Sequence, residues 1–104
     1  MQISTTEAEG SSTIKIEGDL LISCVAEAKP QLEDALGATG DIRLDLGALG
    51  EIDTAGLQLL LMLHASARKK SRRLVIVARP ATFSAALERI GIPVGHFPYQ
   101  EGTN

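Results

Sequence analysis

Strands and helices alternate along the later two thirds of this chain, and no other sequence feature constrains its fold as strongly. Alternating apolar residues predict a strand over 41–46, and the unbroken apolar run Leu74-Val75-Ile76-Val77 predicts a strand over 73–78 that is buried on both faces. Helical spacing predicts three helices, over 25–36, 54–70 and 80–90. Because strands separated by helices pair in parallel with right-handed crossovers, we expect an α/β domain.

The two ends of the chain add further strands to this pattern. Residues 2–8 and 12–17 read as a hairpin, since turn-forming residues separate them, and a last short strand is predicted over 94–97. We therefore expect one α/β domain over 1–104, with a core over 1–98 and a loose tail over 99–104. Its sheet is expected to be mixed, with four to five strands, an N-terminal hairpin and then alternating helices and strands.

Two segments interrupt this pattern. Pro30 falls inside the helix predicted over 25–36, where a missing backbone donor costs about 3 kcal/mol. Either the helix begins near Lys29, with Pro30 in its first turn, or it is kinked, and we favour one helix with a tolerated distortion. Gly37 follows as a natural helix stop. Residues 47–53 are predicted to be a loop, because they lack both the helical and the strand period.

Composition excludes several classes of protein. The 104 residues include 10 basic and 13 acidic side chains, a net charge of −3, and aromatic residues make up only 3%. Both features argue against a nucleic-acid partner. A single cysteine, Cys24, rules out a disulfide framework, and no metal site, cofactor motif or catalytic set can be argued from spacing. The enzyme hypothesis is therefore weak.

The sequence also offers no candidate for a membrane-spanning segment. The longest apolar run, Leu59 to Leu63, is far too short to span a bilayer, so we expect no direct membrane insertion. The first residues lack the basic and apolar regions of a signal peptide, which favours a cytoplasmic protein.

The junction before the helix predicted over 54–70 carries the strongest functional signal. Asp53 and Thr54 are both good N-cap residues, so one interpretation is that they only cap the helix. The other is that Thr54 is a modification site, because free N–H groups and the helix dipole favour a phosphate there. Gly56 either lets the helix pack closely on the sheet or leaves room for a ligand.

Several segments resemble the STAS domain family, which includes the bacterial anti-sigma factor antagonists. Asp53-Thr54-Ala55-Gly56-Leu57 resembles the family motif D-[ST]-x-G-L, and Gly18-Asp19-Leu20 resembles its G-[ED]-L. Asp45 matches the aspartate at the end of the preceding strand. The resemblance implies a non-enzymatic regulatory module that is switched when a partner kinase phosphorylates Thr54. The implied partner is a GHKL-type serine/threonine kinase or an anti-sigma factor.

Two departures from the antagonist pattern keep an alternative open. Leu21 stands where many antagonists have an aspartate, and Gln58 stands where many have a glycine. The run Gly56-Leu57-Gln58-Leu59-Leu60-Leu61 looks more like the stand-alone STAS proteins of chemotaxis signalling, or the STAS subunit of Mla-type lipid-transport systems, and the segment over 25–32 looks closer to the first of these. The alternative function is therefore a subunit that binds and regulates an ABC-transporter ATPase, with Thr54 at the contact.

The helix predicted over 54–70 has an apolar stripe wider than one core face needs, which favours a docking surface beside Thr54. We expect at least one of Leu59, Met62 and Leu63 to be partly exposed. The predicted partner-binding residues are Asp53, Thr54, Ala55, Gly56, Leu57, Gln58, Leu59 and Met62.

Three other features have mainly structural interpretations. A basic cluster lies at the end of this helix, where cations complement the dipole, and the less favoured interpretation is a phosphate or lipid-headgroup site. Its members are Arg68, Lys69, Lys70, Arg72 and Arg73. His64 is expected to be a partly buried packing residue. Cys24 is expected to be a small buried residue, because nothing basic adjoins it.

Overall fold

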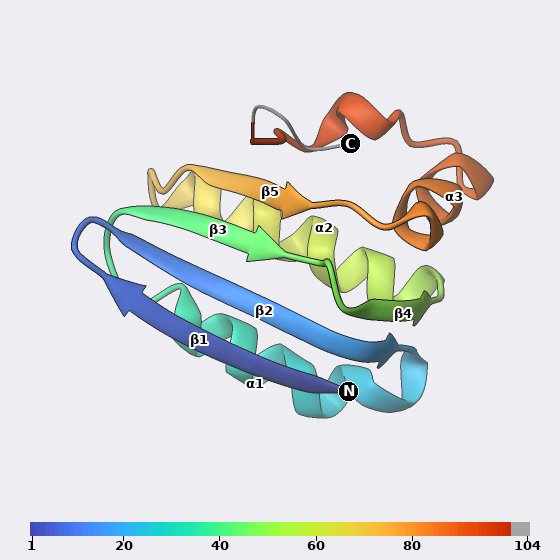
Figure 1. The fold of residues 1–104 in the computed structure, drawn as a ribbon, viewed down its shortest axis with the longest axis horizontal. Coiled ribbons are helices and arrows are strands. Elements are labelled where there is room, and N and C mark those ends of the chain that lie inside the picture. The colour runs from blue at the N-terminus through green and yellow to red at the C-terminus, as the bar shows by residue number, and fades with distance from the viewer. Residues whose placement is uncertain (101–104) are drawn as a thin grey trace.

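The computed structural model describes residues 1–100, which form a mixed five-stranded sheet with helices (Figure 1). Four strands are ordered β1-β2-β3-β5, and β4 pairs with the C-terminal end of β2. The strands are β1 (Gln2–Ala8), β2 (Ser11–Leu20), β3 (Asp41–Asp45), β4 (Leu49–Ile52) and β5 (Leu74–Ala78). The first pair is antiparallel and the others are parallel, so the predicted hairpin followed by crossovers is confirmed.

Two helices cover one face of this sheet, and a third lies beyond its β4 end (Figure 1). The helices are α1 (Val25–Ala35), α2 (Thr54–Lys69) and α3 (Ala81–Arg89), and one-turn 3₁₀ helices occupy Ile22–Cys24 (η1) and Val94–His96 (η2). The sheet contributes alternate apolar residues to the core: Ile14, Ile16, Ile42, Leu44, Leu74 and Ile76. Val75 and Val77 are only half-buried, so the prediction that β5 is buried on both faces is wrong.

The segment predicted to be a loop over 47–53 contains β4. Its two apolar ends, Leu49 and Ile52, are buried, and Gly18 and Leu20 of β2 pair with them. A four-residue strand is too short to show the alternation on which a sequence prediction depends. Strand β2 also extends past its predicted end at residue 17 to Leu20, because pairing with β4 continues the strand through Gly18 and Asp19, where the alternation of buried residues stops.

The predicted strand over 94–97 is also wrong. The backbone N–H of His96 donates to the carbonyl of Pro93, so this segment closes a local 3₁₀ turn. The strand-like contact comes later, where Tyr99 bridges to Ile76 of β5 and the N–H of Gln100 donates to the carbonyl of Ile76 at 2.8 Å. Tyr99 and Gln100 are therefore not loose, and the rest of the predicted tail lies outside the described residues.

Pro30 lies inside α1, which runs as one helix as predicted. Pro30 and Ala26 are both exposed. The carbonyl group that loses its helical donor therefore lies on the solvent side, where water can satisfy it.

Arg72 is the buried member of the basic cluster, with 5% of its surface exposed. Its guanidinium donates to the carbonyls of Ala35 and Gly40, each at 2.8 Å, and also contacts Ser12 and Thr39. Arg72 therefore complements the C-terminal end of α1, whereas the sequence suggested that it served the end of α2. The other cations of the cluster, Arg68, Lys69, Lys70 and Arg73, are exposed.

Candidate functional site

Asp53 is the N-cap of α2, and its carboxylate makes two hydrogen bonds. Oδ1 accepts from the backbone N–H of Gly56 at 2.8 Å, and Oδ2 accepts from the N–H of Ile22 at 2.8 Å. The Gly56 bond, with the Ile22 bond, holds the pKa of Asp53 below its ordinary value, although desolvation opposes this shift. Asp53 is thus held as a carboxylate, and it ties the start of α2 to the 3₁₀ helix η1, which leads into α1.

Thr54 is the first residue of α2, and its side chain is exposed. Within residues 1–100 its hydroxyl makes no hydrogen bond, because Asp53 already caps the helix. A free hydroxyl at the positive end of a 16-residue helix is open to a modifying partner. The sequence offered both Asp53 and Thr54 as caps of this helix, and in the structure the cap is Asp53.

Gly56 allows the first turn of α2 to pack against the end of β2. A Cβ atom at this position would collide with the carbonyl oxygen of Leu20 and lie 3.0 Å from the side chain of Ile52. Because the first obstacle is backbone, it cannot move aside cheaply. Gly56 is therefore explained by close packing of helix and strand.

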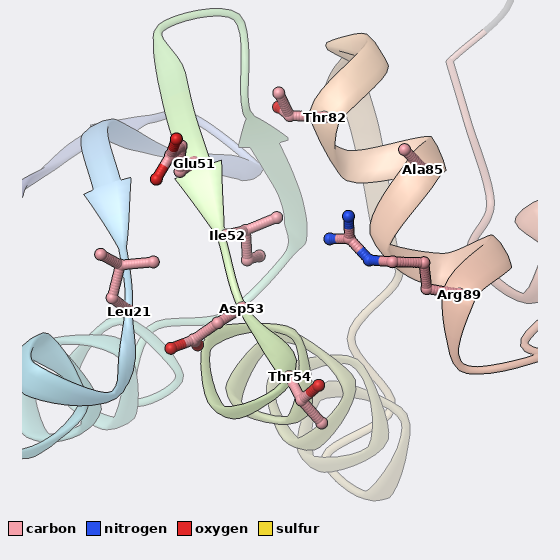
Figure 2. Close-up of a pocket in the computed structure, with 8 residues that line it drawn as sticks. All are labelled: Leu21, Glu51, Ile52, Asp53, Thr54, Thr82, Ala85 and Arg89. Atoms are coloured by element: carbon pink, nitrogen blue, oxygen red, sulfur yellow. The ribbon is translucent and has the colours of Figure 1, made fainter.

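A pocket of about 510 Å³ opens beside Thr54, between the β4–α2 junction and α3 (Figure 2). We call it the α2–α3 pocket. Its lining residues are Leu21, Glu51, Ile52, Asp53, Thr54, Thr82, Ala85 and Arg89. In Figure 2 the side chain of Arg89 extends from α3 toward the end of β4, where Ile52 lies.

Sequence reasoning missed the α3 wall of this pocket. Thr82, Ala85 and Arg89 are spaced three and four residues apart, so they share one face of α3. That spacing was visible in the sequence. However, the tertiary packing of α3 beside β4 decides that this face looks toward Thr54.

The structure divides the predicted partner-binding residues into two groups. Thr54 and Gln58 are exposed, and Asp53, Ala55 and Met62 are partly exposed. Gly56, Leu57 and Leu59 are buried, so the expectation that these three touch a partner is corrected: they pack in the core of the domain.

The wide apolar stripe of α2 is explained mostly by burial. Leu59 and Leu63 are 5% and 0% exposed, which leaves Met62 as the partly exposed member of the predicted trio. The helix packs against the sheet and also contacts α1 and α3, so several of its sides are covered.

Asp45 and Asp19, the two other aspartates that match the STAS pattern, accept hydrogen bonds from the backbone near the site. Asp45 accepts from the N–H of Gly47 at 2.9 Å, which shapes the turn out of β3. Asp19 accepts from the N–H of Glu51 at 2.8 Å, which joins the end of β2 to β4. Both therefore position the strand that leads into Thr54.

His64 is a packing residue, as expected, but it is buried rather than partly buried, and it packs against the C-terminal segment. Its ring centroid lies 5.6 Å from that of His96 and 5.2 Å from that of Phe97. Burial lowers the pKa of His64, and the nearby His96 and Arg68 lower it further. Cys24 is only partly buried, and its thiol donates to the carbonyl of Asp19.

The protein is an α/β domain with a mixed sheet, and the segment that resembles the STAS motif, Asp53 to Leu57, lies at the N-terminus of α2. A family model described as "Mlab, STAS domain" matches residues 3–94. The chain therefore belongs to the STAS domain family. No curated protein matches significantly.

Solved structures share this fold at low sequence identity. An anti-sigma factor antagonist from Mycobacterium paratuberculosis superposes with a TM-score of 0.77 at 17% identity, over 96% of this chain and 85% of that one. RsbS of Moorella thermoacetica, in a serine-to-glutamate variant, gives 0.74 at 18%, over 96% and 86%. The Bacillus cell-fate determinant SpoIIAA in its phosphorylated form gives 0.69 at 17%, over 97% and 93%. The chain thus has the fold of the anti-sigma factor antagonists.

No helix within residues 1–100 combines the length and the apolar character that a bilayer crossing requires.

Proposed function

We propose that this chain is a non-enzymatic interaction module whose binding is switched by phosphorylation of Thr54. One observation carries the proposal. The Thr54 hydroxyl is exposed and unbonded within the described residues, at the N-terminus of α2, while Asp53 alone caps the helix. Thr54 can therefore be modified without loss of the cap.

The proposed partner is a GHKL-type serine/threonine kinase or an anti-sigma factor. In the kinase reaction the γ-phosphoryl group of ATP would move to Oγ1 of Thr54, the hydroxyl proton would leave, and ADP would be released. The docking surface would consist of the accessible residues at the start of α2: Asp53, Thr54, Ala55, Gln58 and Met62.

Charge explains how the switch would work. A phosphate adds about −1.5 to −2 charges and three acceptor oxygens. The domain would tolerate it, because the helix dipole and free N–H groups favour an anion at this position. A docked partner would have to desolvate the new charge beside the carboxylate of Asp53, and binding would weaken.

A second candidate is a subunit that binds and regulates an ABC-transporter ATPase, with the same surface at the contact. The description of the matching family model, which names Mlab, favours it. So do Leu21 and Gln58, which depart from the antagonist pattern. In this function Thr54 would contact the ATPase without being modified.

A pull-down with intact-mass measurement separates the two candidates. The wild-type chain, Thr54→Ala and Thr82→Ala would be expressed in bacterial cells and recovered with their partners. Thr82 is the matched control, because it is another exposed threonine of the α2–α3 pocket.

The proposed switch predicts a recovered kinase or anti-sigma factor, and a mass increase of one phosphate that disappears only in Thr54→Ala. A phosphate retained in Thr54→Ala would refute the assignment of the site. Recovery of a transporter ATPase with unmodified Thr54 would favour the second candidate.

A further inference from the structure

Arg89 is the only cation among the residues that line the α2–α3 pocket. It lies on the wall opposite the β4–α2 junction, and its guanidinium extends across the pocket toward the end of β4 (Figure 2). Arg89 is exposed, and within residues 1–100 it forms no ion pair. Its charge is therefore available to an anion that enters this pocket.

Thr54 lies on the other side of the same pocket, next to the carboxylate of Asp53. Both carboxylate oxygens of Asp53 already accept backbone hydrogen bonds, from Gly56 and Ile22, and within the described residues Asp53 forms no ion pair with Arg89. Among the labelled residues of the α3 wall, Arg89 lies nearest to Thr54, and the small side chains of Thr82 and Ala85 line the wall beyond it (Figure 2).

We propose that Arg89 binds the phosphate of phosphorylated Thr54 within the same chain and so links α3 to the start of α2. This inference rests on the proposed function, because it concerns the phosphorylated form of Thr54. The planar guanidinium offers two parallel N–H donors that match two phosphate oxygens, which a lysine cannot do. The phosphate then occupies the α2–α3 pocket and neutralises Arg89, the one cation that lines it. A partner can therefore use neither the pocket nor the charge of Arg89.

The interaction can be measured without knowing the kinase. Phosphothreonine is installed at position 54 by genetic code expansion, and the phosphate is titrated by ³¹P NMR. The second pKa of a phosphorylated side chain is about 6, and a nearby cation lowers it because it favours the dianion. The variant is Arg89→Gln, and the matched control is Arg73→Gln, which removes an exposed cation outside the α2–α3 pocket.

We expect the phosphate pKa in Arg89→Gln to lie roughly half a unit above that of the wild type. Arg73→Gln should leave it unchanged, and Arg89→Lys should restore only part of the difference. Equal values in the wild type and Arg89→Gln would overturn the role of Arg89, and so would an equal rise in Arg73→Gln.

The two proposals fail separately in this design. If no kinase modifies Thr54 in cells, the proposed switch fails, but the titration of the installed phosphate still measures the Arg89 contact. If a kinase does modify Thr54 and the titration shows no Arg89 effect, the switch stands and the Arg89 contact is wrong.

Discussion

The carboxylate of Asp53 accepts a hydrogen bond of 2.8 Å from the backbone N–H of Ile22, a residue 31 positions earlier in the chain. The other oxygen of the same carboxylate caps α2 through Gly56. One side chain therefore sets the position of two helix beginnings, and the free hydroxyl of Thr54 lies directly after it.

Replacement of Asp53 by alanine should destabilise the domain by about 1–2 kcal/mol, because it removes the N-cap of α2 and the acceptor for Ile22. Asp53→Asn should cost less, since its amide oxygen can still accept one of the two bonds. Urea denaturation measures both variants. If Asp53→Ala is as stable as the wild type, the capping role is wrong.

Thr54→Glu should fold with a free energy of unfolding within about 0.5 kcal/mol of the wild type, because exposed substitutions have small effects and the helix dipole favours an acid here. Thr54→Ala should be equally mild, since Asp53 is the cap. Partner binding should weaken about tenfold or more in Thr54→Glu only.

Melting curves and a binding titration test these two variants together. Unfolding of Thr54→Glu would show that Thr54 is a structural residue. Wild-type affinity in Thr54→Glu would refute switching by charge.

Gly56→Ala should destabilise the domain by about 1–3 kcal/mol, because its Cβ would meet the backbone carbonyl of Leu20. The loss should outweigh the gain of up to about 1 kcal/mol from the better helix propensity of alanine. Gly95→Ala is the control, since a Cβ there meets nothing within 4 Å. Thermal melts of equal midpoint for the two variants would contradict this packing role.

Arg72→Met should destabilise the domain by about 3 kcal/mol, because the carbonyls of Ala35 and Gly40 lose a buried donor. Arg73→Met removes an exposed neighbour and should change the free energy of unfolding by no more than about 0.5 kcal/mol. Chemical denaturation compares the pair. Equal losses would mean that the bonds made by Arg72 are not what stabilises this corner of the fold.

His64 should make stability depend on pH. Its pKa in the folded state is lowered from 6.5, first by burial and then by His96 and Arg68. The unfolded chain therefore binds more protons near pH 6, and stability should fall as the pH drops below 6.5. We expect the loss between pH 7.5 and 5.5 to be smaller in His64→Gln. An unchanged pH profile in that variant would assign the effect to other groups.

The sequence predicted those strands and helices that are long enough for their own residues to show a hydrophobic period. Strands β1, β3 and β5 and helices α1, α2 and α3 all formed within two residues of the predicted limits. The sequence did not predict β4, because Leu49 to Ile52 spans too few residues to show alternation, and its strand character comes from pairing with β2. The 3₁₀ turn at Val94 likewise depends on a local bond that hydropathy does not report.

By itself, the sequence determined where α2 begins and that a capping carboxylate and a hydroxyl meet there, because capping depends on groups within one helical turn. Only the tertiary structure decided which apolar residues of α2 are accessible: it buried Leu57 and Leu59 and left Met62 partly exposed. It also placed Arg89 across a pocket from Thr54. The physical reason is that helical period reports which side chains share a face, whereas burial and pocket formation depend on elements that arrive from distant parts of the chain.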